Sequence, residues 1–276
     1  MQEGSHGILV SITFPIHKVN EFAEQALNSL LNQSYQHIEI MFLDNSLTGL
    51  HNCFDFTDQR IRYFKLPPDF GLAETLNFAI DNAKGKYLAR MDYDDISLPS
   101  RILEQVRFME ENANIVISGT NIVVIGKAID SNVEPGQEVK RKFVHNEITY
   151  GLLANNAFFH PTVIFRLDDL KKAKLRYRKA YDSAEDLDLW CRASRVVKLA
   201  NLDKALVLYR VHANQYSRLD GHTSNFKANR VRIWHSLWLM RTRQIPLILG
   251  LKICIKLVFR SVELWDRKRK TNFSKL

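Results

Sequence analysis

Short apolar runs alternate with amphipathic segments along the first half of the chain. Four runs rich in β-branched or other apolar residues predict buried strands: ILVSITF (8–14), HIEIMFLD (37–44), RIRYFKL (60–66) and KYLARMD (86–92). Apolar positions recur at helical spacing in three further segments, which predict helices over 19–31, 72–83 and 99–112. Because strands and helices alternate, we expect an α/β fold with a mostly parallel central sheet flanked by helices.

The second half of the chain has a less regular pattern. It begins with a polar connection over 127–145, which contains Pro135 and Gly136. Beyond it the pattern predicts three elements: a strand over 155–167, a helix over 184–195 with an acidic first turn, and a strand over 204–212.

Carboxylates follow two of the predicted strands. Asp44 ends the second strand, and Asp92, Asp94 and Asp95 follow the fourth within four positions. Ligands of parallel sheets bind outside the carboxyl ends of the strands, so we expect these acids to share one crevice. An unpaired cluster of like charges repels itself, which indicates that a cation belongs among Asp92, Asp94 and Asp95.

The positive charge of the chain is concentrated at its C-terminal end. The 276 residues carry a formal net charge of +9. Residues 227–276 hold thirteen Lys and Arg but only two acids, a net of +11, so residues 1–226 carry −2. This asymmetry predicts an anionic surface as the partner of the C-terminal segment rather than of the body.

Cysteine usage and the N-terminus favour a reducing compartment. Cys53, Cys191 and Cys254 are far apart and lack the spacing of a disulfide framework or a zinc site. The first fifteen residues lack the basic and apolar regions of a signal peptide. We therefore expect a cytoplasmic protein.

Several motifs in this order resemble the family 2 glycosyltransferases, which have the GT-A nucleotide-sugar fold. The resemblance covers roughly residues 8–217. It is carried by the opening strand that ends in Pro15 and by the segments SLLNQSY, IEIMFLD, GLAETLNFAIDNAKGKYLARMDYDD, LPSRILEQ, HPTVIFR, AEDLDLW and YRVH. At three positions near the expected nucleotide base the chain departs from the family pattern: Asn45 after Asp44, Ile16-His17-Lys18 after Pro15, and Leu76.

The resemblance implies specific roles for residues in these motifs. Asp186 is the implied general base. Asp94, Asp95 and His212 are the implied ligands of Mn²⁺ or Mg²⁺, ions that prefer hard oxygen ligands. The residues implied to bind substrate are Pro15, Asp44, Asp92, Asp94, His160, Glu185 and Arg210. Which of Asp92, Asp94 and Asp95 binds metal and which binds ribose stays open.

Each of these motifs also has a structural interpretation. Asp44 would equally close a turn before NSLTG. Asp186 would simply be an acid in the first turn of a helix, where it complements the helix dipole. His212 would be a hydrogen-bonded histidine at a strand end, and Asp95 a helix cap.

The basic C-terminal segment predicts an amphipathic helix. The apolar run 246–259 is interrupted by Lys252 and Lys256 and is too short for a confident membrane span. Charged residues recur at gaps of four and three and make a mostly basic stripe, which is followed by the RKRK run (267–270): Lys252, Lys256, Arg260, Glu263 and Arg267. Residues 244–270 therefore fit a helix lying on an anionic membrane surface. Packing on the catalytic domain or on another subunit is the alternative, and no motif indicates nucleic-acid binding.

We predict a glycosyltransferase domain over 1–217 and a basic helical tail over 218–276. Within the domain, 1–126 forms the nucleotide-sugar half and 127–217 the acceptor and catalytic-base half. The resemblance implies inverting transfer from a nucleotide-diphosphate sugar, UDP favoured, to a hydroxyl of a glycan or lipid-linked acceptor in cell-surface polysaccharide synthesis. The alternatives are a metal-dependent nucleotidyltransferase, a glycoside hydrolase with paired carboxylates, and a non-catalytic nucleotide- or glycan-binding relative.

Overall fold

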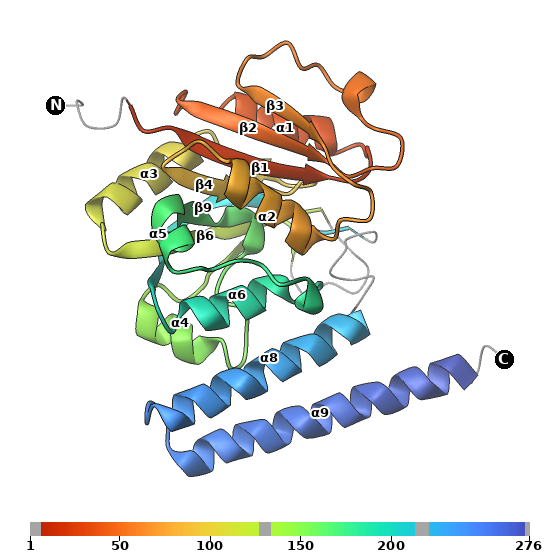
Figure 1. Ribbon diagram of the computed structural model, residues 1–276, viewed down its shortest axis with the longest axis vertical. Coiled ribbons are helices and arrows are strands. Elements are labelled where there is room, and N and C mark those ends of the chain that lie inside the picture. The colour runs from red at the N-terminus through yellow and green to blue at the C-terminus, as the bar shows by residue number, and fades with distance from the viewer. Residues whose placement is uncertain (1–6, 127–133, 213–220, 274–276) are drawn as a thin grey trace.

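One sheet with helices on both faces forms the body of the protein (Figure 1). The computed structural model describes residues 7–126, 134–212 and 221–273, without the side chains of 221–224 and 263–273. Within them the sheet has nine strands in the order β3-β2-β1-β4-β8-β6-β9-β5, with β7 paired to β6. The strands are β1 (Val10–Ile16), β2 (Ile38–Asp44), β3 (Ile61–Lys65), β4 (Tyr87–Arg90), β5 (Ile96–Ser97), β6 (Ile115–Ile125), β7 (Glu138–Val139), β8 (Ile164–Arg166) and β9 (Lys198–Arg210).

The helices follow the predicted order in the first half and add short elements in the second. They are α1 (Ala23–Leu31), α2 (Leu72–Asn82), α3 (Arg101–Glu111), α4 (His145–Gly151), α5 (Leu167–Lys172), α6 (Glu185–Ala193), α8 (Gly221–Arg241) and α9 (Leu247–Phe273). The predicted α/β class is confirmed.

The first four predicted strands form the parallel part of the sheet. β1 pairs in parallel with β2 and β4, and β2 with β3. Every residue of β1 and β2 is buried, because helices cover both faces of these strands. Consequently β1, β2 and β4 all end at the same edge.

The rest of the sheet is mixed. β8 is antiparallel to β4 and β6, and β6 runs parallel to β9. The strand predicted over 155–167 shrinks to β8, because His160–Thr162 forms a single 3₁₀ turn around Pro161, whose nitrogen has no proton for a sheet hydrogen bond. The strand β6 was not predicted from the sequence pattern, although Asn112 and Asn114 mark a turn between α3 and its apolar run.

Alternate residues along a strand pack into two hydrophobic cores, one on each face of the sheet. In β2, Ile40 and Phe42 pack with α1 and α3, whereas Met41 and Leu43 pack with α2 and α6. The second core contains Trp190 of α6, which is fully buried. Its ring centroid lies 5.0 Å from that of Phe158 and 6.0 Å from that of Phe165. This packing holds α6 in place.

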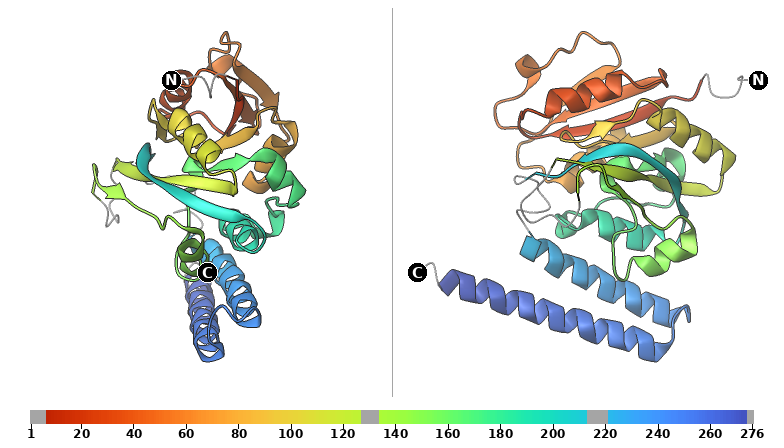
Figure 2. Two further views of the ribbon diagram at one scale, coloured as in Figure 1. Left: turned by 90° about the vertical axis from the view of Figure 1, so that its left-hand side faces the viewer. Right: turned by 180° about the vertical axis from the view of Figure 1, so that it is seen from behind.

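The C-terminal helix α8 packs along the outer face of α6, and α9 lies beside α8 (Figures 1 and 2). Gly250 permits their close approach, since a Cβ there would come within 2.2 Å of Met240 Cγ. No described helix is both long and apolar enough to cross a membrane. The predicted domain boundary at 217 and the side chains of Glu263, Arg267 and the RKRK run lie outside the described residues.

Replacing Trp190 with Ala should lower the free energy of unfolding by about 3–5 kcal/mol, because it leaves a large cavity between the sheet and α6. Trp234→Ala is the matched control, since Trp234 is 58% exposed. Urea denaturation followed by circular dichroism measures both changes. Equal stability losses in the two variants would contradict the assignment of Trp190 as the anchor of α6.

Candidate active site

A cavity of about 710 Å³ opens where β1, β2 and β4 end. Its position agrees with the rule that ligands of such sheets bind beyond the carboxyl ends of the strands. Six residues predicted from the sequence line it: Pro15, Asp92, Asp94, His160, Glu185 and Asp186. The structure therefore brings together residues that are up to 171 positions apart in the chain.

The three acids after β4 form a tight cluster. One carboxylate oxygen from each of Asp92, Asp94 and Asp95 lies within 4.8 Å of the others. Asp95 is only 1% exposed, and its Oδ1 accepts the backbone N–H of Arg210 at 2.7 Å. The other oxygen, Oδ2, is buried without a hydrogen-bond partner among the described residues. Such an orphaned anionic oxygen is a free ligand position.

Burial and mutual repulsion make this cluster electrostatically unfavourable on its own. Burial, together with the charge of Asp92, raises the pKa of Asp94. Burial and the charges of Asp94 and Asp92 raise the pKa of Asp95 well above its usual range. A divalent cation would offset this repulsion, and hard carboxylate oxygens are the ligands that Mg²⁺ and Mn²⁺ prefer. The residues present thus fit such an ion.

Residues of β9 and the segment after it brace the cluster. His212 Nε2 lies 2.9 Å from Asp94 Oδ2, so the predicted histidine and acid do meet. The Arg210 side chain donates from Nε to the carbonyl of Asp94 at 2.9 Å and from a terminal nitrogen to Gln25 Oε1 at 2.7 Å. Neither residue lines the cavity, and in this arrangement Arg210 supports the acids.

Two buried arginines that sequence analysis did not single out lie beneath the cluster. Arg90 is 3% exposed and makes two bonds to Asp92, at 2.8 and 2.6 Å. Arg101 is fully buried and donates to the carbonyl of Arg90 at 2.6 Å. Burial lowers the pKa of Arg101 to about 9, and the charge of Asp95 acts in the opposite direction. Together the positive charges of these two guanidinium groups partly neutralise the negative charges of Asp92, Asp94 and Asp95.

The opposite wall of the cavity carries the acids at the start of α6. Burial and the neighbouring Asp186 raise the pKa of Glu185 to about 8. Burial also raises the pKa of Asp186, although hydrogen bonds from the backbone N–H of Leu187 (2.6 Å) and from Asn156 Nδ2 limit the rise. Asp186 is half-buried at the cavity wall, so its carboxylate can reach a ligand there.

A neutral histidine adjoins these acids. His160 Nε2 lies 2.9 Å from the hydroxyl of Tyr177, and its ring packs edge-on against Trp190. Burial and the nearby charge of Arg90 hold the pKa of His160 well below its usual range. His160 therefore supplies a polar but uncharged surface to the cavity at neutral pH.

Asp44 sits where the structural interpretation expected it. Its carboxylate is buried and accepts the backbone N–H groups of Ser46 at 2.8 Å and Leu50 at 2.6 Å, closing the turn after β2. Burial opposes ionisation, but hydrogen bonds from Ser46, Tyr63 and Leu50 keep the pKa of Asp44 below its usual value. It does not line the cavity, whereas the turn residues Asn45 and Ser46 do.

Arg90, Asn156 and Arg141 of the site were not predicted from the sequence. Arg90 had a detectable signal, because residues two apart on a strand face the same side and Arg90 precedes Asp92 by two. Asn156 and Arg141 lie in irregular segments without one. Arg141 lines the cavity with its guanidinium 4.0 Å over the Phe159 ring.

The chain resembles known proteins along most of its length. A sequence model described as "Glycosyl transferase family 2" matches residues 11–166. An uncharacterized glycosyltransferase of Haemophilus influenzae is 32% identical over 232 residues, covering 81% of this chain and 72% of the relative. The O-antigen biosynthesis glycosyltransferase WbnJ of Escherichia coli is 31% identical over 217 residues, covering 74% of this chain and 80% of that protein.

Among solved structures, residues 1–349 of Staphylococcus aureus TarS in complex with UDP-GlcNAc superpose with a TM-score of 0.67. The sequences are 16% identical, and the match covers 90% of this chain and 71% of TarS 1–349. This likeness confirms the predicted GT-A fold. Since the family model also spans more than half of the chain, the protein belongs to glycosyl transferase family 2 and is a glycosyltransferase.

Proposed function

We propose that the protein transfers one sugar, with inversion at the anomeric carbon, from a nucleoside diphosphate to an acceptor hydroxyl. The observation that carries this proposal is that one cavity has two acidic walls. One wall fits a cation and a diphosphate, and the other presents a carboxylate of raised pKa. These are the two functions that direct displacement requires.

The cluster of Asp92, Asp94 and Asp95 is the proposed site of Mn²⁺ or Mg²⁺. Asp94 and Asp95 would hold the ion, with the unpaired Asp95 Oδ2 as the most available oxygen. Asp92 is engaged by Arg90 and would contact the donor. His212 is the proposed additional ligand next to Asp94. When bound, the ion would neutralise charge on the diphosphate.

Asp186 is the proposed general base. Its carboxylate would accept the proton of the acceptor hydroxyl while that oxygen bonds to the anomeric carbon and the bond to the diphosphate breaks. The hydrogen bond from Asn156 fixes the orientation of Asp186. Inversion follows from a single displacement, so no protein nucleophile is needed. Glu185 and His160 would position the sugars on this wall.

The donor is proposed to be a UDP-sugar, as suggested by the UDP-GlcNAc complex of the similarly folded TarS. Pro15 and the turn closed by Asp44 would form the base-binding end of the cavity. Arg141 is a further candidate for contact with the anionic donor, whereas Arg210 would act by bracing the acids. The O-antigen relative supports a glycan or lipid-linked acceptor in cell-surface polysaccharide synthesis.

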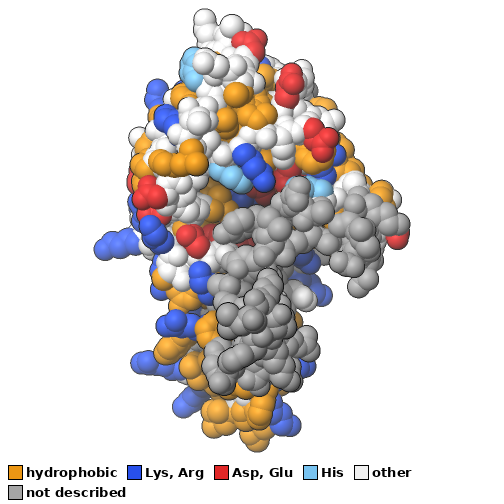
Figure 3. Space-filling view, turned by 90° about the vertical axis from the view of Figure 1, so that its right-hand side faces the viewer, with side chains coloured by type: hydrophobic (Ala, Val, Ile, Leu, Met, Phe, Trp, Pro, Cys, Tyr) orange, Lys and Arg blue, Asp and Glu red, His pale blue; other side chains and the backbone are white. Residues whose placement is uncertain are grey.

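The helices α8 and α9 are proposed to hold the enzyme at the cytoplasmic face of an anionic membrane. Large apolar side chains are exposed along both helices, and the lower part of Figure 3 shows them between Lys and Arg side chains. They are Phe226, Trp234, Leu237, Leu247, Ile248, Leu249, Leu251, Ile255, Val258, Phe259 and Val262. No acid occurs between residues 221 and 262 of the α8–α9 hairpin, so this part of it complements anionic lipid.

Chelation should abolish sugar transfer, and Mn²⁺ or Mg²⁺ should restore it. Asp94→Asn or Asp95→Asn should raise the metal concentration that gives half-maximal activity and should reduce the metal-induced increase in Tm. Asp203→Asn, at an exposed acid on β9, is the control and should leave both unchanged. Full turnover in excess chelator would rule out the metal role.

Asp186→Asn should lower kcat by about 10²–10⁴-fold, because it removes the base. Donor affinity, measured by calorimetry, should stay the same.

In the wild type, activity should rise with pH through the raised pKa of Asp186, because the base works only when deprotonated. Burial and the negative charge of Asp186 raise the pKa of Glu185 to about 8, so Asp186 loses its proton first, while Glu185 is still neutral. Glu185→Gln should therefore leave this rise at the same pH. A rise that moves to lower pH in this variant would show that Glu185 is charged when Asp186 loses its proton.

Replacing Lys252, Lys256 and Arg260 together with Gln should weaken binding to anionic vesicles. At about 1 kcal/mol for each basic residue near the surface, the loss is roughly 100-fold. A control variant removes three exposed lysines from the body, Lys171, Lys172 and Lys174, and should bind normally. Vesicle sedimentation measures both. An equal loss in the control would contradict a specific membrane face.

A further inference from the structure

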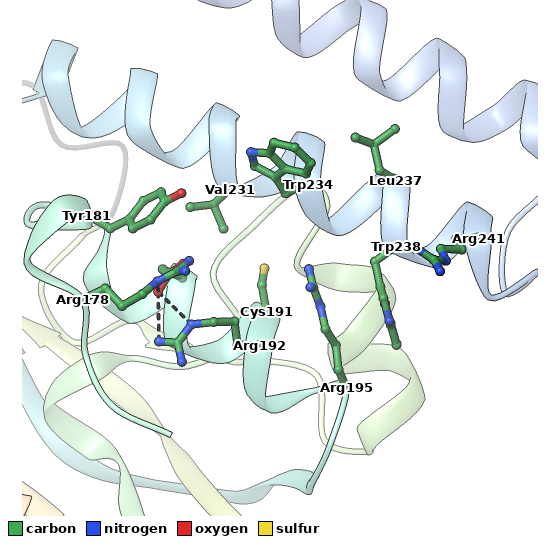
Figure 4. A pocket seen from close by; sticks show the side chains of 11 residues that line it. Arg178, Tyr181, Cys191, Arg192, Arg195, Val231, Trp234, Leu237, Trp238 and Arg241 are labelled. Atoms are coloured by element: carbon green, nitrogen blue, oxygen red, sulfur yellow. Dashed lines mark hydrogen bonds and ion pairs between the residues drawn. The ribbon is translucent and has the colours of Figure 1, made fainter. Parts of the chain in front are cut away.

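A second cavity, of about 400 Å³, lies between α6 and α8 (Figure 4). It shares no lining residue with the candidate active site. Arg178, Arg192 and Arg195 come from the side of α6, and Trp234, Trp238 and Arg241 face them from α8.

The lining carries an excess of positive charge. Four arginines and one acid, Asp188, contribute to it, which leaves three positive charges uncompensated. Asp188 is already saturated, because it accepts from Arg178 Nε at 2.8 Å and from Arg192 Nε at 3.0 Å. Among the described residues, neither Arg195 nor Arg241 has an acidic partner.

Arg195 contributes to the lining a buried N–H group that is unpaired within the part of the chain that the structure describes. Its Nε is closed off from solvent and has no hydrogen-bond acceptor among the described residues. Its guanidinium lies 5.2 Å from the ring centroid of Trp238, which leaves the edge with the N–H groups unused. Burial lowers the pKa of Arg195; Cys191 and Asp188 act in the opposite direction, and the charges of Arg192 and Arg178 lower the pKa further. A bound anion would relieve both the repulsion and the missing acceptor.

We propose that this cavity, the arginine pocket, binds a phosphate group. Guanidinium groups match phosphate oxygens with paired N–H donors. Several arginines around one cavity are therefore better suited to bind a phosphate group than to form a nonspecific positively charged surface. The tryptophans supply an apolar wall beside the charged one.

The surroundings of the pocket indicate a phosphate attached to an apolar chain. Trp234 and Leu237 line the pocket and also belong to the exposed apolar face of α8, at 58% and 40% exposure. A second, apolar groove that includes both residues continues along α8 to Val258 and Val262 of α9. A phosphate head group in the arginine pocket would therefore place its chain along the proposed membrane face. This assignment of the source rests on the membrane attachment proposed above, whereas phosphate binding itself does not.

Binding can be tested without a membrane, by titrating the protein with inorganic phosphate and with the water-soluble lipid dihexanoyl phosphatidate. Trp234 and Trp238 line the pocket, so intrinsic fluorescence reports occupancy. We expect saturable binding of dihexanoyl phosphatidate that is at least about tenfold tighter than binding of inorganic phosphate, because only the lipid also buries apolar surface.

Arg241→Gln and Arg195→Lys should each weaken phosphatidate binding by about tenfold, the effect of losing a charged hydrogen bond. Arg241 is exposed, so its substitution should leave the fold intact, and Tm verifies this. Arg243→Gln is the matched control, because Arg243 lies outside the pocket in the turn after α8.

Equal affinity for inorganic phosphate and phosphatidate would overturn the lipid source. Absence of saturable binding for either probe, or equal weakening by Arg243→Gln, would overturn the phosphate site. Because the vesicle experiment removes Lys252, Lys256 and Arg260, none of which lines the pocket, failure of membrane attachment and failure of this site are distinguishable.

Discussion

The buried guanidinium of Arg90 is the interaction on which the candidate active site depends. It forms two bonds to Asp92 on the wall after β4. Its charge also favours the ionised forms of Asp95, in the same cluster, and of Glu185 and Asp186, which line the cavity from the start of α6. Without this cation, five acids would crowd one partly buried space, and leaving such charges unpaired is strongly destabilising.

The positive charge of Arg90 alone does not neutralise the acids of the site, and the remaining negative charge indicates a function. Asp94 and Asp95 have raised pKa values even with Arg90 and Arg101 nearby. The fold therefore keeps acids where they repel one another, a pattern typical of functional sites. A divalent ion would be attracted by the negative charge of Asp92, Asp94 and Asp95. A proton moving to Asp186 would be attracted by the negative charge of that carboxylate.

The helix α6 connects this chemistry to the C-terminal hairpin. It starts with Glu185 and Asp186 at the cavity, and Trp190 anchors its middle in the core. Its last turn and the residues after it contribute Arg192 and Arg195 to the arginine pocket, against which α8 packs. Since the helix is short and rigidly packed, a ligand held between α6 and α8 would have a fixed position relative to the proposed base.

The sequence by itself determined the first half of the fold and most of the acidic residues in the site. Helix and strand periods differ, so the pattern up to α3 could be assigned locally, and carboxylates after parallel strands must lie at one edge of the sheet. Only the tertiary structure decided the roles of Arg90, Asn156 and Tyr177, the extent of β6 and β8, and the existence of the arginine pocket. These depend on contacts between residues distant in the chain, and a local pattern of apolar and polar residues carries no information about which partner a buried polar group will find.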